Sequence, residues 1–111
     1  IYGKNLNQNL IEIPKKNKLS ISTFHLYVIK VKQKNKHKGL FNLLRKNKIY
    51  VNLHYLPVHL QPYFRKKGFK KGTFKNSEDH AKRAISLPVY PGLKIKNINK
   101  IINLVNNFLV K

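Results

Sequence analysis

The chain has 111 residues, a length that fits a single small domain with a modest core. Its 24 Lys plus Arg residues against 3 Asp plus Glu give a formal net charge of +21, while 41% hydrophobic residues exclude a wholly disordered basic tail. No apolar run approaches the ~20 residues of a membrane span, and residues 1–14 lack the pattern of a signal peptide. The absence of cysteine excludes disulfides and fits a reducing cytoplasm.

The first half of the chain predicts two helix–strand pairs. The expected elements, in order, are the end of a helix over 1–10, an extended connection over 11–18, a strand over 24–32, a helix over 37–47 and a strand over 49–53. The strand over 24–32 (FHLYVIKVK) alternates and is apolar on much of both faces. In the helix, Leu40, Phe41, Leu43 and Leu44 recur at helical spacing.

The second half predicts an irregular segment, a loop and two helices. The expected elements are an irregular segment over 54–63 (HYLPVHLQPY), a basic loop over 64–75, a short helix over 77–85, a connection over 86–92 (SLPVYPG) and a final helix over 95–109 with one apolar stripe. Ser77 or Asn76 is the expected N-cap of the short helix, whose first turn is acidic. This order predicts a small two-layer α/β (α+β) fold, in which helices cover one face of a short sheet.

The positive charge first suggests a nucleic-acid partner, because Lys and Arg contacts with phosphates release counterions. Only three of the basic residues are Arg, however, and Arg is the side chain preferred for bidentate phosphate and guanine contacts. Lys, Asn and Ile, which are encoded by A/T-rich codons, make up 46 of the 111 residues, and the lysines are spread along the whole chain. These features favour a solvated basic surface and leave a small nucleic-acid-binding protein as the alternative.

No self-contained active site emerges from these residues. Three carboxylates are too few for most metal sites, Ser-His-Asp and Cys-His arrangements lack support, and there is no glycine-rich phosphate loop. His54 and His59 are of a type that ligates zinc, but no third ligand is in view. We therefore expect neither a metal site nor a complete catalytic constellation in this chain.

The segment HYLPVHLQPY carries the best candidates for binding. Its two prolines fix the backbone and present two histidines and two tyrosines in a set geometry at low entropic cost. Loops on a rigid scaffold are common places for binding groups, which favours a ligand-facing role for His54 and His59. For Tyr63, packing on the domain and contact with a ligand remain equally open.

Four stretches of the chain match a known family in order: HLYVI at 25–29, LFNLLR at 40–45 running into Ile49, HYLPVHLQPY at 54–63, and Glu78 leading to SLPVYPGL at 86–93. In this combination nearly the whole chain resembles the C-terminal part of the DegT/DnrJ/StrS family of sugar-nucleotide aminotransferases, which use pyridoxal phosphate. The run HYLPVHLQPYFRKKGFKKGTF most resembles the branch that aminates a UDP-linked 4-keto-6-deoxy-N-acetylhexosamine on the route to pseudaminic acid.

The resemblance implies the fold of aspartate aminotransferase, in which a large cofactor-binding domain precedes a smaller C-terminal domain. Residues 1–111 would be only the small domain, which fits the absence of methionine and hence of a start codon. The complete enzyme would move an amino group from glutamate to the keto carbon of the sugar nucleotide. The Schiff-base lysine lies upstream in the family, so none of the 21 lysines here is expected to be catalytic and the chain alone is expected to be inactive.

The resemblance also implies partners and a location. Family members are usually homodimers with active sites at the subunit interface, so we expect a cytoplasmic homodimer that binds a nucleotide sugar and glutamate. Membrane association is not expected, and contact with nucleic acid would be non-specific only.

Position in the family's motif implies which side chains approach the sugar nucleotide. In descending order of expectation they are His59, then His54 and Tyr55, then Gln61, Tyr63 and Arg65. Arg65 would be a diphosphate partner by its charge. His25, on a strand, is assigned to structure.

The chain departs from the family's pattern at two places. Lys48 and Tyr50 stand where glycine is frequent, so Lys48, or Asn47 in its place, is expected to take a left-handed C-cap conformation. Lys75 and Ser77 replace a frequent proline and alanine before Glu78. These differences bear on local stability more than on function.

Overall fold

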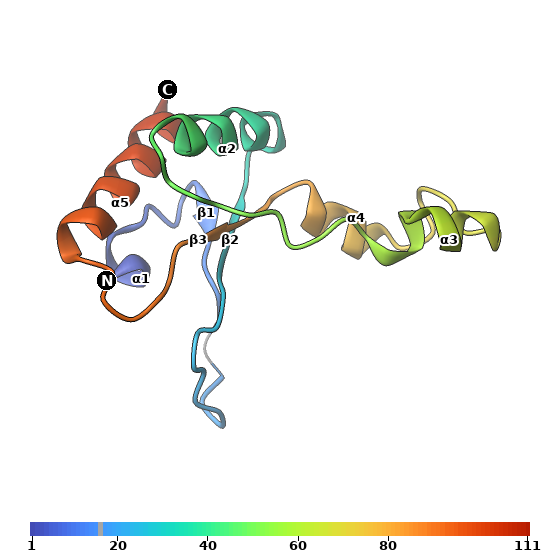
Figure 1. The fold of residues 1–111 in the computed structure, drawn as a ribbon, viewed down its shortest axis with the longest axis horizontal. Coiled ribbons are helices and arrows are strands. Elements are labelled where there is room, and N and C mark those ends of the chain that lie inside the picture. Colours follow the sequence, from blue (N-terminus) through green and yellow to red (C-terminus); the bar gives the residue numbers. More distant parts are fainter. Residues whose placement is uncertain (16) are drawn as a thin grey trace.

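The computed structural model of the protein describes residues 1–15 and 17–111; Lys16, inside the expected connection over 11–18, lies outside them. In chain order the elements are α1 (Tyr2–Asn5), β1 (Ile11–Glu12), β2 (Tyr27–Val31), η1 (Lys34–Lys36), α2 (His37–Lys46), η2 (Val58–Leu60), α3 (Pro62–Lys66), α4 (Lys75–Ala81), β3 (Ala84–Leu87) and α5 (Ile95–Val110). Helices α1, α2 and α5 gather beside the sheet, whereas α3 and α4 lie away from it (Figure 1). No helix in the described part of the chain is long and apolar enough to cross a membrane.

The sheet is antiparallel and has the order β1-β2-β3. Strand β2 is central: Val31 pairs with Ile11 of β1, and Ile29 pairs with Ile85 of β3. Tyr27, Ile29 and Val31 alternate along β2 and are buried. The alternation that predicts a strand here is confirmed, although the regular strand covers 27–31 and not 24–32.

Helices α2 and α5 close the core over one face of this sheet. Leu40 and Leu44, four residues apart on α2, and Val105 of α5 are fully buried. Burial of such a side chain contributes roughly 1.5–3 kcal/mol. Both helices are confirmed as the periodicity predicts, except that Ile95, at the start of the expected stripe, stays 63% exposed.

The end of α2 is closed by a lysine in the left-handed region. Lys48 has φ 60°, whereas Asn47 has φ −84°. The Ile49 N–H donates to Leu44 O at 3.0 Å, which satisfies a carbonyl at the helix end. Of the two residues that the sequence offers for this conformation, Lys48 is the one that adopts it.

Residues 84–87 overturn a prediction. The sequence predicts a helix over 77–85 and a connection from Ser86, but α4 ends at Ala81 and Ala84–Leu87 forms β3. All four side chains of β3 are buried, so pairing with β2 and core burial override the local helical pattern. The N-cap is also different, because α4 begins at Lys75 with Phe74 at the capping position.

Four smaller expectations differ in detail. The expected strand over 49–53 meets the sheet only at an isolated bridge between Asn52 and Ser86, although Ile49 and Val51 are buried alternately as in a strand. The expected first helix is a single turn, and the expected connection over 11–18 begins with β1. The basic loop over 64–75 contains the end of α3 and the first residue of α4.

Residues 53–82, here called the arm, leave the body of the domain after the Asn52 bridge and return to it at β3. Figure 1 shows α3 and α4 on this arm, directed away from the sheet and from α2 and α5. The projection makes the molecule long: its extents are 47 × 37 × 26 Å and its radius of gyration is 15.4 Å. A compact domain of this length would have a radius of gyration of about 13 Å. The arm begins with most of the sequence-predicted binding residues.

Candidate functional site

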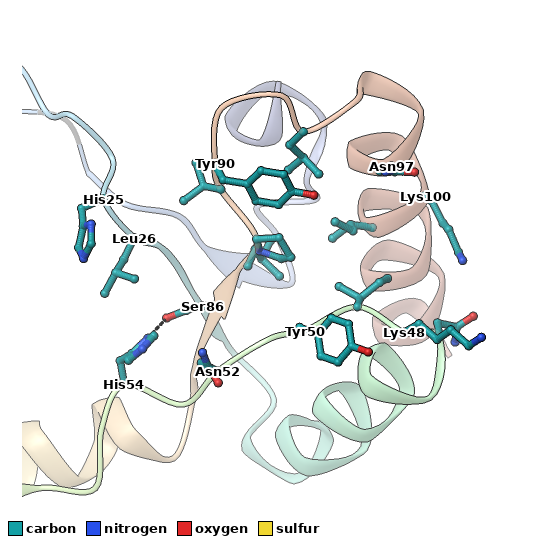
Figure 2. Close-up of a pocket in the computed structure, with 17 residues that line it drawn as sticks. His25, Leu26, Lys48, Tyr50, Asn52, His54, Ser86, Tyr90, Asn97 and Lys100 are labelled. Atoms are coloured by element: carbon teal, nitrogen blue, oxygen red, sulfur yellow. Dashed lines mark hydrogen bonds between the residues drawn. The ribbon is translucent and has the colours of Figure 1, made fainter.

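A groove of about 550 Å³ opens beside the edge of the sheet, where four segments distant in sequence meet. They are residues 25–26, the run over 47–54, the connection over 86–93, and the first half of α5. Figure 2 shows His54 and Ser86 at one end, and Tyr50, Tyr90 and Lys100 around the other. Only the folded chain brings these residues together.

His54 stands where the arm leaves the sheet. Its Nδ1 is hydrogen-bonded to Ser86 Oγ at 2.6 Å, and Ser86 is buried on β3, where its backbone also pairs with Asn52 (Figure 2). The ring of Tyr55 packs against the imidazole edge-on, with 4.5 Å between centroids. The imidazole is therefore held on two sides, and its orientation in the groove is fixed by the sheet.

The opposite end of the groove combines positive charge with exposed aromatic rings. Lys48 and Lys100 line it, together with Tyr50 and Tyr90, whose exposed fractions are 74% and 56%. The Arg45 guanidinium lies 5.2 Å from the centroid of the Tyr50 ring. None of the lining residues carries a carboxylate. Cations beside flat rings suit an anionic ligand that has a planar group, such as a nucleoside diphosphate.

His59, the first choice from the sequence, lies in the arm and is only 6% exposed. Its Nε2–H donates to Glu78 Oε1 at 3.0 Å, and the Gly72 N–H donates to the same oxygen at 2.6 Å. These two hydrogen bonds, the one from His59 being the larger cause, hold the pKa of Glu78 below its usual value. The ring of Phe74 packs edge-on against the imidazole at 5.0 Å. His59 also lines a shallow hollow beside Thr73, but its low exposure leaves the side chain little access to solvent.

The remaining predicted residues lie on the surface of the arm. Tyr55 and Tyr63 are 71% and 64% exposed, and Gln61 and Arg65 are exposed as well. The Lys67 ammonium lies 5.6 Å from the centroid of the Tyr63 ring. The structure thus brings His54 into the groove, places the surface residues along the first part of the arm, and buries His59. Whether any of them contacts a substrate stays a prediction.

The sequence-based set misses the other half of the groove. Tyr50, Tyr90 and Lys100 come from three separate segments, and none of them stands out by residue type or spacing. Ser86 and Tyr90 do fall in the quoted SLPVYPGL stretch, which was the one available signal. Their role as neighbours of His54 depends on the pairing of β3 with the sheet.

All three carboxylates of the chain are engaged in ion pairs or hydrogen bonds. Glu12 lies 2.6 Å from both Lys30 and Arg83, and Glu78 is held by His59 and Gly72. Asp79 is similarly paired with Lys34 and Arg83. No group of three or more metal-ligating side chains occurs in the part of the chain that the structure describes. Most lysines in the described part of the chain are exposed and form none of these ion pairs, so the surface is basic.

Comparison with known sequences gives a match over nearly the whole chain. A family model described as the DegT/DnrJ/EryC1/StrS aminotransferase family matches residues 1–106. The spore coat polysaccharide biosynthesis protein SpsC of Bacillus subtilis is 31% identical over 91 residues, which are 78% of this chain and 23% of that protein. Across the curated relatives it matches, the chain spans between 17% and 26% of their length.

Solved structures agree on the fold. A DegT/DnrJ/EryC1/StrS aminotransferase from Brucella abortus is similar with a TM-score of 0.82 and 26% identity, covering 99% of this chain and 29% of that one. PseC of Helicobacter pylori, an aminotransferase involved in the biosynthesis of pseudaminic acid, gives a TM-score of 0.71 at 26% identity, covering 80% of this chain and 24% of that one. The expected small α+β fold, with helices covering a short sheet, is confirmed, and the similar structures are aminotransferases of fold type I. The sheet has three strands, of which the sequence predicts only β2.

Proposed function

The chain belongs to the DegT/DnrJ/EryC1/StrS aminotransferase family, and we propose that it is the C-terminal domain of a pyridoxal-phosphate-dependent sugar-nucleotide aminotransferase. The observation that carries the proposal is the family match over residues 1–106, combined with a span of only 17% to 26% of the curated relatives. Neither the family nor the relatives named above favour the nucleic-acid-binding alternative.

The residues of this chain do not by themselves fit pyridoxal phosphate. The cofactor needs a partner, often a carboxylate, for its pyridinium nitrogen in addition to a Schiff-base lysine. Every carboxylate side chain here already has partners. Glu12 and Asp79 form ion pairs with Arg83 and with lysines, and Glu78 accepts hydrogen bonds from His59 and Gly72. The groove offers lysines but no carboxylate beside them. The cofactor site therefore belongs to another part of the complete protein, and this chain contributes no step through it.

We further propose the reaction and its substrate. Glutamate gives up its amino group and becomes 2-oxoglutarate, while the 4-keto carbon of a UDP-linked 6-deoxy-N-acetylhexosamine becomes an amine-bearing carbon. The support is the run HYLPVHLQPYFRKKGFKKGTF, together with similarity to PseC, an aminotransferase involved in pseudaminic acid biosynthesis, and to SpsC, a spore coat polysaccharide biosynthesis protein. The complete enzyme would act as a cytoplasmic homodimer.

Within that reaction, this chain binds and orients the sugar nucleotide. His54 has an imidazole fixed by Ser86, Tyr50 and Tyr90 offer ring faces, and the groove lysines offer charge to a diphosphate. Tyr55, Gln61, Tyr63 and Arg65 are exposed along the adjoining part of the arm and extend this binding surface.

The test uses the complete reading frame, expressed and loaded with pyridoxal phosphate. Incubation with glutamate and the UDP-linked 4-keto-6-deoxy-N-acetylhexosamine should yield 2-oxoglutarate and an amino sugar nucleotide in equal amounts. In parallel, His54→Ala should raise the KM for the sugar nucleotide while the absorbance of the bound cofactor is unchanged. Loss of the cofactor spectrum in His54→Ala would contradict the assigned role, and a complete protein that forms no amino sugar from any keto-sugar nucleotide would overturn the proposed function.

A further inference from the structure

The arm has almost no apolar core, so its shape must be held in another way. Among residues 53–82, all of which the structure describes, only Pro57, His59 and Glu78 are buried. Two of these three are ionisable side chains, which are rarely buried in proteins unless they are paired. The aromatic rings of the arm are at best half-buried, and they follow one another in contact from Tyr63 through Phe64, Phe69 and Phe74 to His59.

His59 and Glu78 join the two halves of the arm. His59 lies on η2, on the segment that leads outward, and Glu78 lies on α4, on the segment that returns to β3 (Figure 1). The hydrogen bond between them joins residues 19 positions apart in sequence. The Gly72 N–H, in the loop between α3 and α4, donates to the same carboxylate oxygen. Three segments of the arm therefore converge on Glu78 Oε1.

We propose that the His59–Glu78 pair is a latch that fixes the shape of the arm, and that His59 is a positioning residue for the sugar nucleotide. The second half of this statement rests on the proposed function. The residues that the arm presents lie on either side of the latch in sequence: Tyr55 precedes His59, and Gln61, Tyr63 and Arg65 follow within six residues. All four are exposed, while His59 itself is buried. A change at His59 thus reaches the substrate through the surface side chains around it.

Removal of Glu78 leaves the buried imidazole of His59 without its hydrogen bond, and removal of His59 leaves the buried carboxylate of Glu78 with the Gly72 N–H alone. Leaving a buried charge without its partner costs more free energy than the intact pair contributes to stability. The arm should therefore open locally before the rest of the domain unfolds. The conservative changes His59→Gln and Glu78→Gln keep a donor and an acceptor, respectively, and should recover part of the effect. His80, an exposed histidine on the same helix α4, provides a matched control through His80→Ala.

The first measurement is hydrogen exchange by mass spectrometry on the complete protein. Peptides that cover residues 67–76 contain the Gly72 amide, and they should exchange roughly tenfold faster in His59→Ala and Glu78→Ala. Peptides from α5 should not change, and His80→Ala should match the wild type throughout. Unchanged exchange over 67–76 in both latch variants would overturn the latch.

The second measurement separates positioning from stability. In His59→Ala the KM for the sugar nucleotide should rise roughly tenfold, while the rate of the half-reaction with glutamate stays within about twofold of wild type, and His59→Gln should recover part of the KM. Faster exchange with an unchanged KM would overturn the positioning role. A complete wild-type protein without transaminase activity would overturn the proposed function, and the exchange data would still decide whether the latch exists.

Discussion

Lys48 occupies a backbone conformation that costs a non-glycine residue free energy. Its φ of 60° lies in the left-handed region, which disfavours an L-residue with a Cβ by roughly 1–2 kcal/mol. Lys48→Gly removes that strain but adds about 0.5–1 kcal/mol of backbone entropy in the unfolded chain. We therefore expect the variant to be more stable by about 0.5–1 kcal/mol, which corresponds to a rise in Tm of about 2–5 °C for a domain of this size.

The assay is thermal unfolding of the 111-residue chain, followed by far-ultraviolet circular dichroism. The matched control is Asn47→Gly, one residue earlier, where φ is −84° and no strain is released. Asn47 Nδ2 also donates to Leu43 O at 2.9 Å, so this control should lose about 0.5–1.5 kcal/mol. If Lys48→Gly lowered Tm as much as Asn47→Gly does, the assignment of strain to Lys48 would be refuted.

Two further changes test the core and the charged edge of the sheet. Ile29→Ala, at a fully buried position of β2, should lower the free energy of unfolding by about 2–5 kcal/mol. The control Ile21→Ala, at a side chain that is 99% exposed, should change it by no more than about 0.5 kcal/mol. Denaturant midpoints compare the two variants, and equal effects would contradict the assignment of Ile29 to the core. Hydrogen bonds from Lys30, and to a lesser extent from Arg83, lower the pKa of Glu12 to about 2. The contribution of Glu12 to the free energy of unfolding is therefore present above pH 4.5 and is lost as the pH falls toward 2. The full shift would correspond to about 3 kcal/mol, but the Glu12 side chain is 36% exposed and solvent screening leaves about 1 kcal/mol. Thermal unfolding against pH should therefore be less steep in this window for Glu12→Gln, and identical slopes would disprove the contribution.

Residue chemistry and the resemblance to the family each predict part of the candidate site. The segment 54–63 was identified from its prolines, histidines and tyrosines, and the structure does place it at the junction of the arm and the sheet. The order of expectation among the residues of that segment rests only on their positions in the family's motif. It could not distinguish His54, whose ring lies in a groove, from His59, whose ring is buried against Phe74. The difference arises from partners that lie 32 and 19 residues away, Ser86 and Glu78.

Local sequence pattern alone determined the elements whose stability depends on one amphipathic face. Helices α2 and α5 follow from apolar residues that recur every three or four positions, and β2 follows from alternation, because each pattern specifies the face that must be buried. The tertiary structure decided where the pattern was ambiguous. Residues 84–87 form a strand because β2 offers hydrogen bonds and the core offers burial, and neither is encoded in the four residues themselves. The groove and the latch were likewise decided by the tertiary structure. Each depends on contacts between segments far apart in sequence, which exist only after the chain has folded.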